Sequence, residues 1–112
     1  MSLMSNVRDP YEIASQEDRS APRQKLRIDA GLRASGEHPF RVAVTDLSLS
    51  GFGCEAVSSL RPGAICWLTL PGMSGLQAEV VWNDGTQVGC AFSNLLARPV
   101  LDHILRRHTV SA

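Results

Sequence analysis

Apolar and polar residues alternate along most of this chain from about Leu26 onwards. Between residues 26 and 33, apolar side chains occupy every second position, and charged residues and Gly31 occupy the positions between them. This period of two predicts a β-strand with one buried face. Five further segments show the same alternation, at residues 40–45, 52–56, 65–70, 77–82 and 87–92. The pattern predicts an all-β domain of six short antiparallel strands, arranged as a small barrel or sandwich.

Turn signals separate the predicted strands. They are Ser35-Gly36, Arg61-Pro62-Gly63, Pro71-Gly72 and Asn83-Asp84-Gly85. After Phe92 the period becomes helical, because Val100 and Ile104 are four positions apart, as are Leu101 and Leu105. We therefore expect one C-terminal helix, packed on an open end or an edge of the sheet.

The first 22 residues show no sustained apolar period and contain Pro10 and Pro22. We expect a flexible N-terminal arm over residues 1–22, followed by one domain over residues 23–108. Met1-Ser2-Leu3, ahead of a second methionine at position 4, looks like a remnant of expression-vector sequence. A length of 112 residues leaves little room for a second domain.

Composition and charge argue against some kinds of binding partner for this protein. Lys+Arg and Asp+Glu number 11 each, so the net charge is zero, which argues against a broad basic face for long nucleic acid. The sequence has no apolar run of about 18 residues, so we expect no membrane insertion and a cytoplasmic location. Cys54, Cys66 and Cys90 are widely spaced within apolar stretches, which predicts buried reduced thiols and no metal site.

Two motifs carry the candidate chemistry. Arg23 and Arg27 flank Gln24-Lys25-Leu26 at the start of the first strand, where their guanidinium groups could close on one ligand from two sides. Arginine presents a planar set of donors that fits both a phosphate and the O6/N7 edge of guanine. The second motif follows the second strand and has the sequence Asp46-Leu47-Ser48-Leu49-Ser50-Gly51. Both motifs indicate binding of an anionic, guanine-containing ligand.

Within the second motif, each polar type has a possible role. Asp46 can accept hydrogen bonds from the ring N–H and amino group of guanine, and Ser48 can donate one to a phosphate or ring nitrogen. Gly51 would let a ligand approach the backbone closely. Taken alone, the same run also fits an Asx-type turn that satisfies its own backbone.

Together, the two motifs make the chain resemble the PilZ domain family of bacterial receptors for cyclic di-GMP. The family signatures are Arg-x-x-x-Arg before the first strand and Asp/Asn-x-Ser-x-x-Gly between the second and third, and both are complete here. The resemblance extends through Val80-Val81-Trp82 and Val88-Gly89-Cys90-Ala91-Phe92 and covers about residues 23–106. It implies a six-stranded antiparallel barrel with a C-terminal helix.

The resemblance also implies that Arg23, Arg27, Asp46, Ser48 and Gly51 bind cyclic di-GMP, with no other cofactor. It implies a receptor or adaptor whose N-terminal arm changes conformation and relays the signal to a protein partner of unknown identity. Arg19 and Arg23 form a second Arg-x-x-x-Arg, but we assign the motif to Arg23 and Arg27 because Arg27 directly precedes Ile28 in the first strand.

Alternative functions remain open at the level of sequence. A PilZ-like domain could act as a protein-interaction module that does not bind the nucleotide. Ser48 or Ser50 could be imagined as a nucleophile with one of the histidines as its base, but no spacing supports such a pair, so we do not expect an enzyme. Trp67 and Trp82 could stack on a base, although their alternating positions favour the core or a groove wall.

Overall fold

The computed structural model of this protein describes residues 24–108. The expected N-terminal arm, with Arg19 and Arg23, lies outside this range. Six strands and one helix are formed: β1 (Gln24–Ala34), β2 (Phe40–Leu47), β3 (Gly51–Glu55), β4 (Ile65–Thr69), β5 (Leu76–Asn83), β6 (Gln87–Phe92) and α2 (Arg98–His108). Each predicted strand and the predicted C-terminal helix are therefore confirmed.

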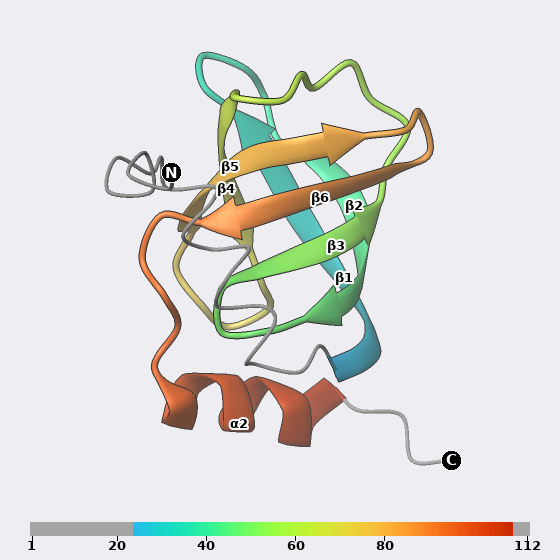
Figure 1. The fold of residues 1–112 in the computed structure, drawn as a ribbon. Coiled ribbons are helices and arrows are strands. Elements are labelled where there is room, and N and C mark those ends of the chain that lie inside the picture. The colour runs from blue at the N-terminus through green and yellow to red at the C-terminus, as the bar shows by residue number, and fades with distance from the viewer. Residues whose placement is uncertain (1–23, 109–112) are drawn as a thin grey trace, which may run out of the picture.

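The strands form a closed antiparallel barrel in the order β1-β2-β3-β6-β5-β4 (Figure 1). β1 is long enough to close it, because one part of this strand pairs with β2 and its last residues also pair with β4, where Ala34 lies opposite Cys66. The predicted turns fit the connections. In the hairpin between β5 and β6, for example, Gly85 has a φ of 101°, which a side chain would disfavour.

Alternate residues of the strands fill the barrel interior. Ile28, Val44, Phe52, Leu68 and Val88 are each at most 2% exposed, as the period of two predicts. The three cysteines are also free and buried, which confirms the prediction of reduced thiols. The Sγ atoms of Cys66 and Cys90 lie 4.0 Å apart in this core.

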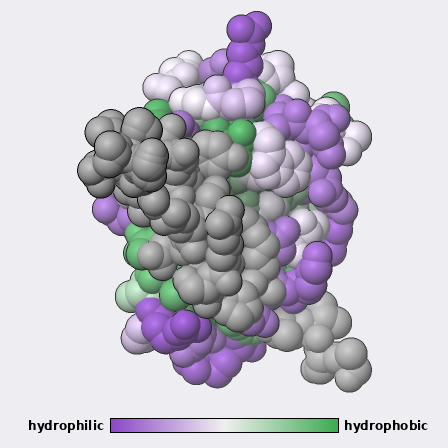
Figure 2. All heavy atoms as spheres, viewed as in Figure 1, coloured by the Kyte–Doolittle hydropathy of each residue, from purple (hydrophilic) through white to green (hydrophobic). Residues whose placement is uncertain are grey.

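Helix α2 lies across one end of the barrel (Figure 1). Leu101 and Ile104 are buried against the core, and just before the helix the amide of Leu96 donates a hydrogen bond of 2.9 Å to the carbonyl oxygen of Leu49. The opposite side of α2 is hydrophilic and forms part of the surface in Figure 2. In the described part of the chain, no helix is long and apolar enough to cross a membrane.

One side chain departs from the predicted alternation. Trp82 was grouped with the inward-facing Ala78 and Val80, but it is 43% exposed and lies on the outer face. The pairing of β5 with β6 shifts by one residue between Val80 and Trp82. Such a β-bulge reverses the side on which the following residues point, so of the two positions considered for Trp82, the core or a groove wall, the core position was wrong.

Candidate functional site

The two sequence motifs meet where β1 begins and β2 ends. Gln24 and Lys25, which lie inside the Arg-x-x-x-Arg motif, pair with Leu47 and Asp46 of the second motif. Directly opposed residues of neighbouring strands share one face of a sheet, so Lys25 and Asp46 both face outward. The start of the first motif, Arg23, lies outside the described residues. The barrel thus joins two segments that are about 20 residues apart in the sequence.

Ser48 organises the turn between β2 and β3. Its side chain is completely buried, and its Oγ accepts hydrogen bonds of 3.2 Å from the amides of Ser50 and Gly51. The amide of Ser48 donates a further bond of 2.9 Å to the carbonyl oxygen of Gly51. The turn therefore satisfies its own backbone, as considered from the sequence, and a serine hydroxyl accepts these bonds in the manner of an Asx-type turn. A direct contact of Ser48 with a ligand stays a prediction.

Gly51 is held tightly against the neighbouring strand. A Cβ atom at this position would lie 2.2 Å from the carbonyl oxygen of Cys90 in β6, which is far inside van der Waals contact. Gly51 is itself buried and lies opposite Ala91. In this structure, the close backbone approach that we expected for a ligand is made by β6, and a contact of Gly51 with a ligand likewise stays a prediction.

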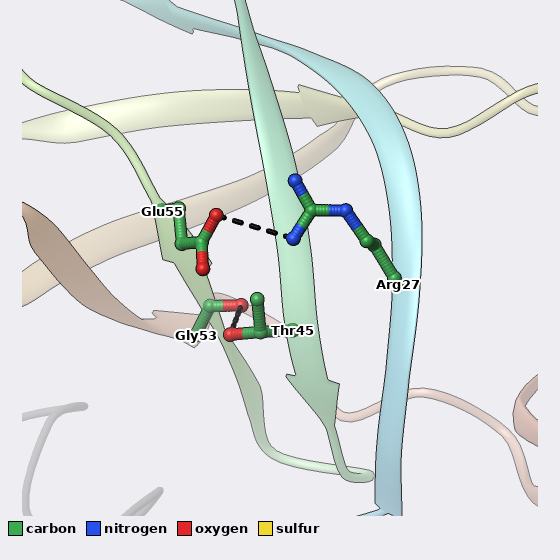
Figure 3. A network of polar contacts seen from close by, with 4 residues as sticks. All are labelled: Arg27, Thr45, Gly53 and Glu55. Atoms are coloured by element: carbon green, nitrogen blue, oxygen red, sulfur yellow. Dashed lines mark hydrogen bonds and ion pairs between the residues drawn. The ribbon is translucent and has the colours of Figure 1, made fainter.

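Asp46 lies on the outer face over Gly53 of β3. A Cβ atom at Gly53 would be 2.5 Å from Oδ2 of Asp46, so the carboxylate occupies the space above this glycine. The pairing of β2 with β3 shifts between Val44 and Asp46, which leaves Thr45 as the extra residue. The Thr45 hydroxyl then donates a 3.5 Å hydrogen bond to the carbonyl oxygen of Gly53 (Figure 3). A bulge therefore presents Asp46 beside a position without a side chain.

A row of paired residues continues from Asp46 across three more strands. Gly53 lies opposite Asp46 and Gly89, and Gly89 lies opposite Trp82. The indole of Trp82 covers Gly89, since a Cβ atom there would meet its Nε1 at 2.3 Å. We call Gly53 and Gly89 the glycine strip. They lie side by side between the Asp46 carboxylate and the partly exposed indole of Trp82. Sequence reasoning missed Gly53 and Gly89, whose only signal is a glycine at an outward position in each of two strands.

Arg27 lies on the outer face near this strip. Its side chain extends from β1 across β2, and its Nη1 lies 3.2 Å from Oε1 of Glu55 in β3 (Figure 3). The two side chains are 60% and 48% exposed, so an incoming ligand can reach both. No motif or spacing in the sequence indicated that Glu55 would contact Arg27.

A separate surface groove in the described part of the chain contains none of the motif residues. An open groove of about 970 Å³ lies over β1 and the loop after β4, where Gly31, Phe40 and Met73 contribute to its lining. Residues 24–108 contain no group of three or more His, Cys, Asp or Glu side chains that could hold a metal ion.

The sequence matches the family model of the PilZ domain over residues 17–109. The chain belongs to the PilZ domain family. The match includes the whole described barrel, helix α2 and both arginines of the first motif. PilZ domains form a family of cyclic di-GMP receptors, and this is a family of binding and adaptor domains, not one of known enzymes. A comparison with curated proteins gave no match.

Proposed function

We propose that this PilZ domain is a receptor for cyclic di-GMP and that the ligand binds on the outer face of the barrel over the glycine strip. The observation that carries the proposal is the pairing of Lys25 with Asp46, which brings the two family motifs together on one face. Three features of this face suit an anionic ligand with flat bases: cations from β1, an outward carboxylate, and a partly exposed indole.

The charges on this face are suited to guanine and phosphate. The Asp46 carboxylate can accept from the N1–H and the amino group on one edge of guanine, and these are donors that adenine does not offer in the same arrangement. The guanidinium groups of Arg27 and Arg23 can donate to the O6/N7 edge or to a phosphate. Lys25, opposite Asp46, adds a further exposed cation from β1. Recognition of both base edges would make the site selective for guanine.

Trp82 supplies the second wall of the proposed site. Its indole is 43% exposed and lies over Gly89 of β6, which is paired with Gly53 of the neighbouring strand β3. Stacking of a base on an aromatic side chain contributes about 1–3 kcal/mol. In this proposal one guanine stacks on the exposed side of the Trp82 indole and meets Asp46 at its edge, so Trp82→Ala weakens binding and Trp82→Phe retains most of it.

The same arrangement provides a route for a signal. Arg23 immediately precedes β1, so a ligand bound by Arg23, Arg27 and Asp46 together would draw the residues before Gln24 over the outer face. A partner protein would then recognise the combined surface of ligand and arm. The alternative, a PilZ domain that binds a protein without the nucleotide, predicts a partner whose affinity does not change with cyclic di-GMP.

Isothermal titration calorimetry with cyclic di-GMP tests the proposal. We expect binding by the wild-type chain, and a loss of about 1.5–3 kcal/mol in Arg27→Ala or Asp46→Ala because each removes a hydrogen bond to a charged group. Arg41→Ala and Glu37→Ala are matched controls, since both residues are exposed and lie at the end of the β1–β2 pair that is remote from Asp46. Their affinities should equal that of the wild type.

Two outcomes would contradict this function. Absence of binding at several hundred micromolar cyclic di-GMP would favour the interaction-only alternative. Equal affinities for cyclic di-AMP and cyclic di-GMP would contradict the roles proposed for Asp46 and the arginines at the guanine edges.

A further inference from the structure

The contact between Arg27 and Glu55 joins a motif arginine to a residue outside both motifs. The two residues are 28 positions apart, and the Arg27 side chain extends over β2 towards the Glu55 carboxylate, which reaches out from β3 (Figure 3). Glu55 is two residues from Gly53 on the same strand and therefore faces the same side of the barrel. The ligand-free protein thus presents a carboxylate bound to the arginine that the ligand needs.

We propose that Glu55 sets the ligand affinity of this site by holding Arg27 in the ligand-free protein and by competing with a ligand phosphate for its guanidinium group. This inference rests on the proposed function, because the competitor is a phosphate of the bound nucleotide. Glu55 is then an affinity-determining residue that belongs to neither family motif.

The exposure of the pair makes this competition feasible. Both side chains are about half exposed, and ion pairs of this kind shift an equilibrium by no more than about fivefold. A ligand phosphate and the Glu55 carboxylate both accept charge-assisted hydrogen bonds from the guanidinium group, so the two compete for the same donors. The phosphate can therefore displace Glu55, but it binds less tightly than it would to an Arg27 without this partner.

Electrostatic repulsion between the Glu55 carboxylate and the ligand phosphates also lowers the ligand affinity. Two residues along a strand correspond to about 7 Å, so the Glu55 carboxylate lies within one Debye length of a ligand on Gly53. Once Arg27 has turned towards the phosphate, the charge of Glu55 is no longer neutralised. An unpaired carboxylate at this distance repels the ligand phosphates.

Glu55→Gln tests the proposal, because it removes the charge and keeps the size of the side chain. Calorimetry should show cyclic di-GMP binding about three- to fivefold tighter than in the wild type. Glu37→Gln removes the same charge from the turn after β1, at a position that has no contact with Arg27, and should change the affinity by less than about twofold. In the Arg27→Ala background, the gain from Glu55→Gln should be smaller than in the wild-type background, because the part that comes from the release of Arg27 is lost and only the repulsion of the ligand phosphates remains. Equal or weaker binding by Glu55→Gln would overturn the proposal.

A second measurement needs no ligand and separates this inference from the proposed function. In ¹⁵N relaxation experiments on the ligand-free protein, the Nε–H group of Arg27 should be more mobile in Glu55→Gln than in the wild type. The mobility of the Arg41 Nε–H group should be the same in both proteins. Equal mobility of Arg27 in both proteins would show that Glu55 does not hold it, whether or not cyclic di-GMP binds. If no variant bound cyclic di-GMP, the proposed function would fail, and with it the competition.

Discussion

The carboxylate of Asp46 occupies the space that a side chain at Gly53 would fill. A Cβ atom on Gly53 would lie 2.5 Å from Oδ2 and 3.1 Å from Cγ of Asp46. Asp46 is therefore positioned by a missing side chain on the neighbouring strand, as well as by the bulge at Thr45. In the proposed site, the position of this carboxylate relative to the glycine strip decides whether it can meet the edge of a guanine base.

Gly53→Ala should impair binding and leave the fold intact. The atoms in the way of the new methyl group belong to the end of one side chain, so Asp46 can move aside at small cost. A displaced carboxylate no longer meets the guanine edge, and we expect an affinity loss of about tenfold or more, since a hydrogen bond to a charged group contributes about 1.5–3 kcal/mol. Calorimetry and thermal unfolding of the same sample measure both effects. Wild-type affinity in this variant would contradict the role of Asp46.

Gly51→Ala, in contrast to Gly53→Ala, should lower the stability of the barrel itself. Its methyl group would meet the backbone carbonyl oxygen of Cys90 at 2.2 Å, and a backbone atom in a closed sheet cannot move aside easily. Overpacking of this kind costs about 1–3 kcal/mol or more. Gly31→Ala is a matched control in β1, because no atom lies within 4 Å of its new Cβ. Urea unfolding should show a lower midpoint for Gly51→Ala only; equal midpoints would show that β3 can separate from β6.

Ser48→Ala should destabilise the turn between the motif strands. The substitution leaves the amides of Ser50 and Gly51 without their 3.2 Å acceptor in a buried place, which costs about 1–3 kcal/mol. Ser59→Ala, at an exposed position, should change the free energy of unfolding by less than about 0.5 kcal/mol. Chemical denaturation compares the two variants. A Ser48→Ala protein as stable as the wild type would mean that the hydroxyl is not needed to form the turn.

The raised pKa of a buried cysteine predicts that the protein loses stability at high pH. Burial raises the pKa of the Cys54 thiol from 9.0 to about 12, whereas the hydrogen bond between Cys66 and Cys90 shifts the pKa values of these two thiols in opposite directions, upwards for Cys90 and downwards for Cys66. Because the folded protein favours the protonated form of Cys54, the contribution of this thiol is fully present below pH 9 and is lost as the pH rises towards 12. Denaturation curves at increasing pH should show this decline, and Cys54→Ala should reduce its slope.

The same burial should protect the thiols from chemical modification. A disulfide reagent that attacks thiolates should react slowly with the native protein at neutral pH and rapidly after unfolding. Fast modification of the native protein would contradict the burial of all three cysteines.

The local pattern of the sequence was sufficient to predict the strands and the helix. Residues such as Ile28, Val44 and Phe52 alternate with outward-facing residues, and glycine-containing turns separate the segments. Trp82 was misplaced because a bulge adds one residue to β5 at a point that no local signal marks. Its position depends on how β5 pairs with β6, which is a property of the folded sheet.

The site could be predicted only in part, for a similar reason. Asp46 and Arg27 were identified from their motifs, but the glycine strip depends on the register between β3 and β6, which brings Gly53 and Gly89 together. The pair of Arg27 and Glu55 forms across an intervening strand. The buried hydroxyl of Ser48 follows from the packing of the turn, whereas the sequence showed only a polar residue in a polar run.

The most direct test of the central claim is a ¹H–¹⁵N NMR titration of the wild-type chain with cyclic di-GMP. The chain has two tryptophans, and their indole N–H signals report on two different faces of the barrel, because Trp82 lies on the glycine strip and Trp67 packs under Arg33. We predict shifts of the Trp82 indole and of the amides of Asp46, Gly53 and Gly89, with the Trp67 indole unchanged. An unchanged spectrum at several hundred micromolar ligand, or shifts at Trp67 without shifts at Trp82, would contradict binding on this face.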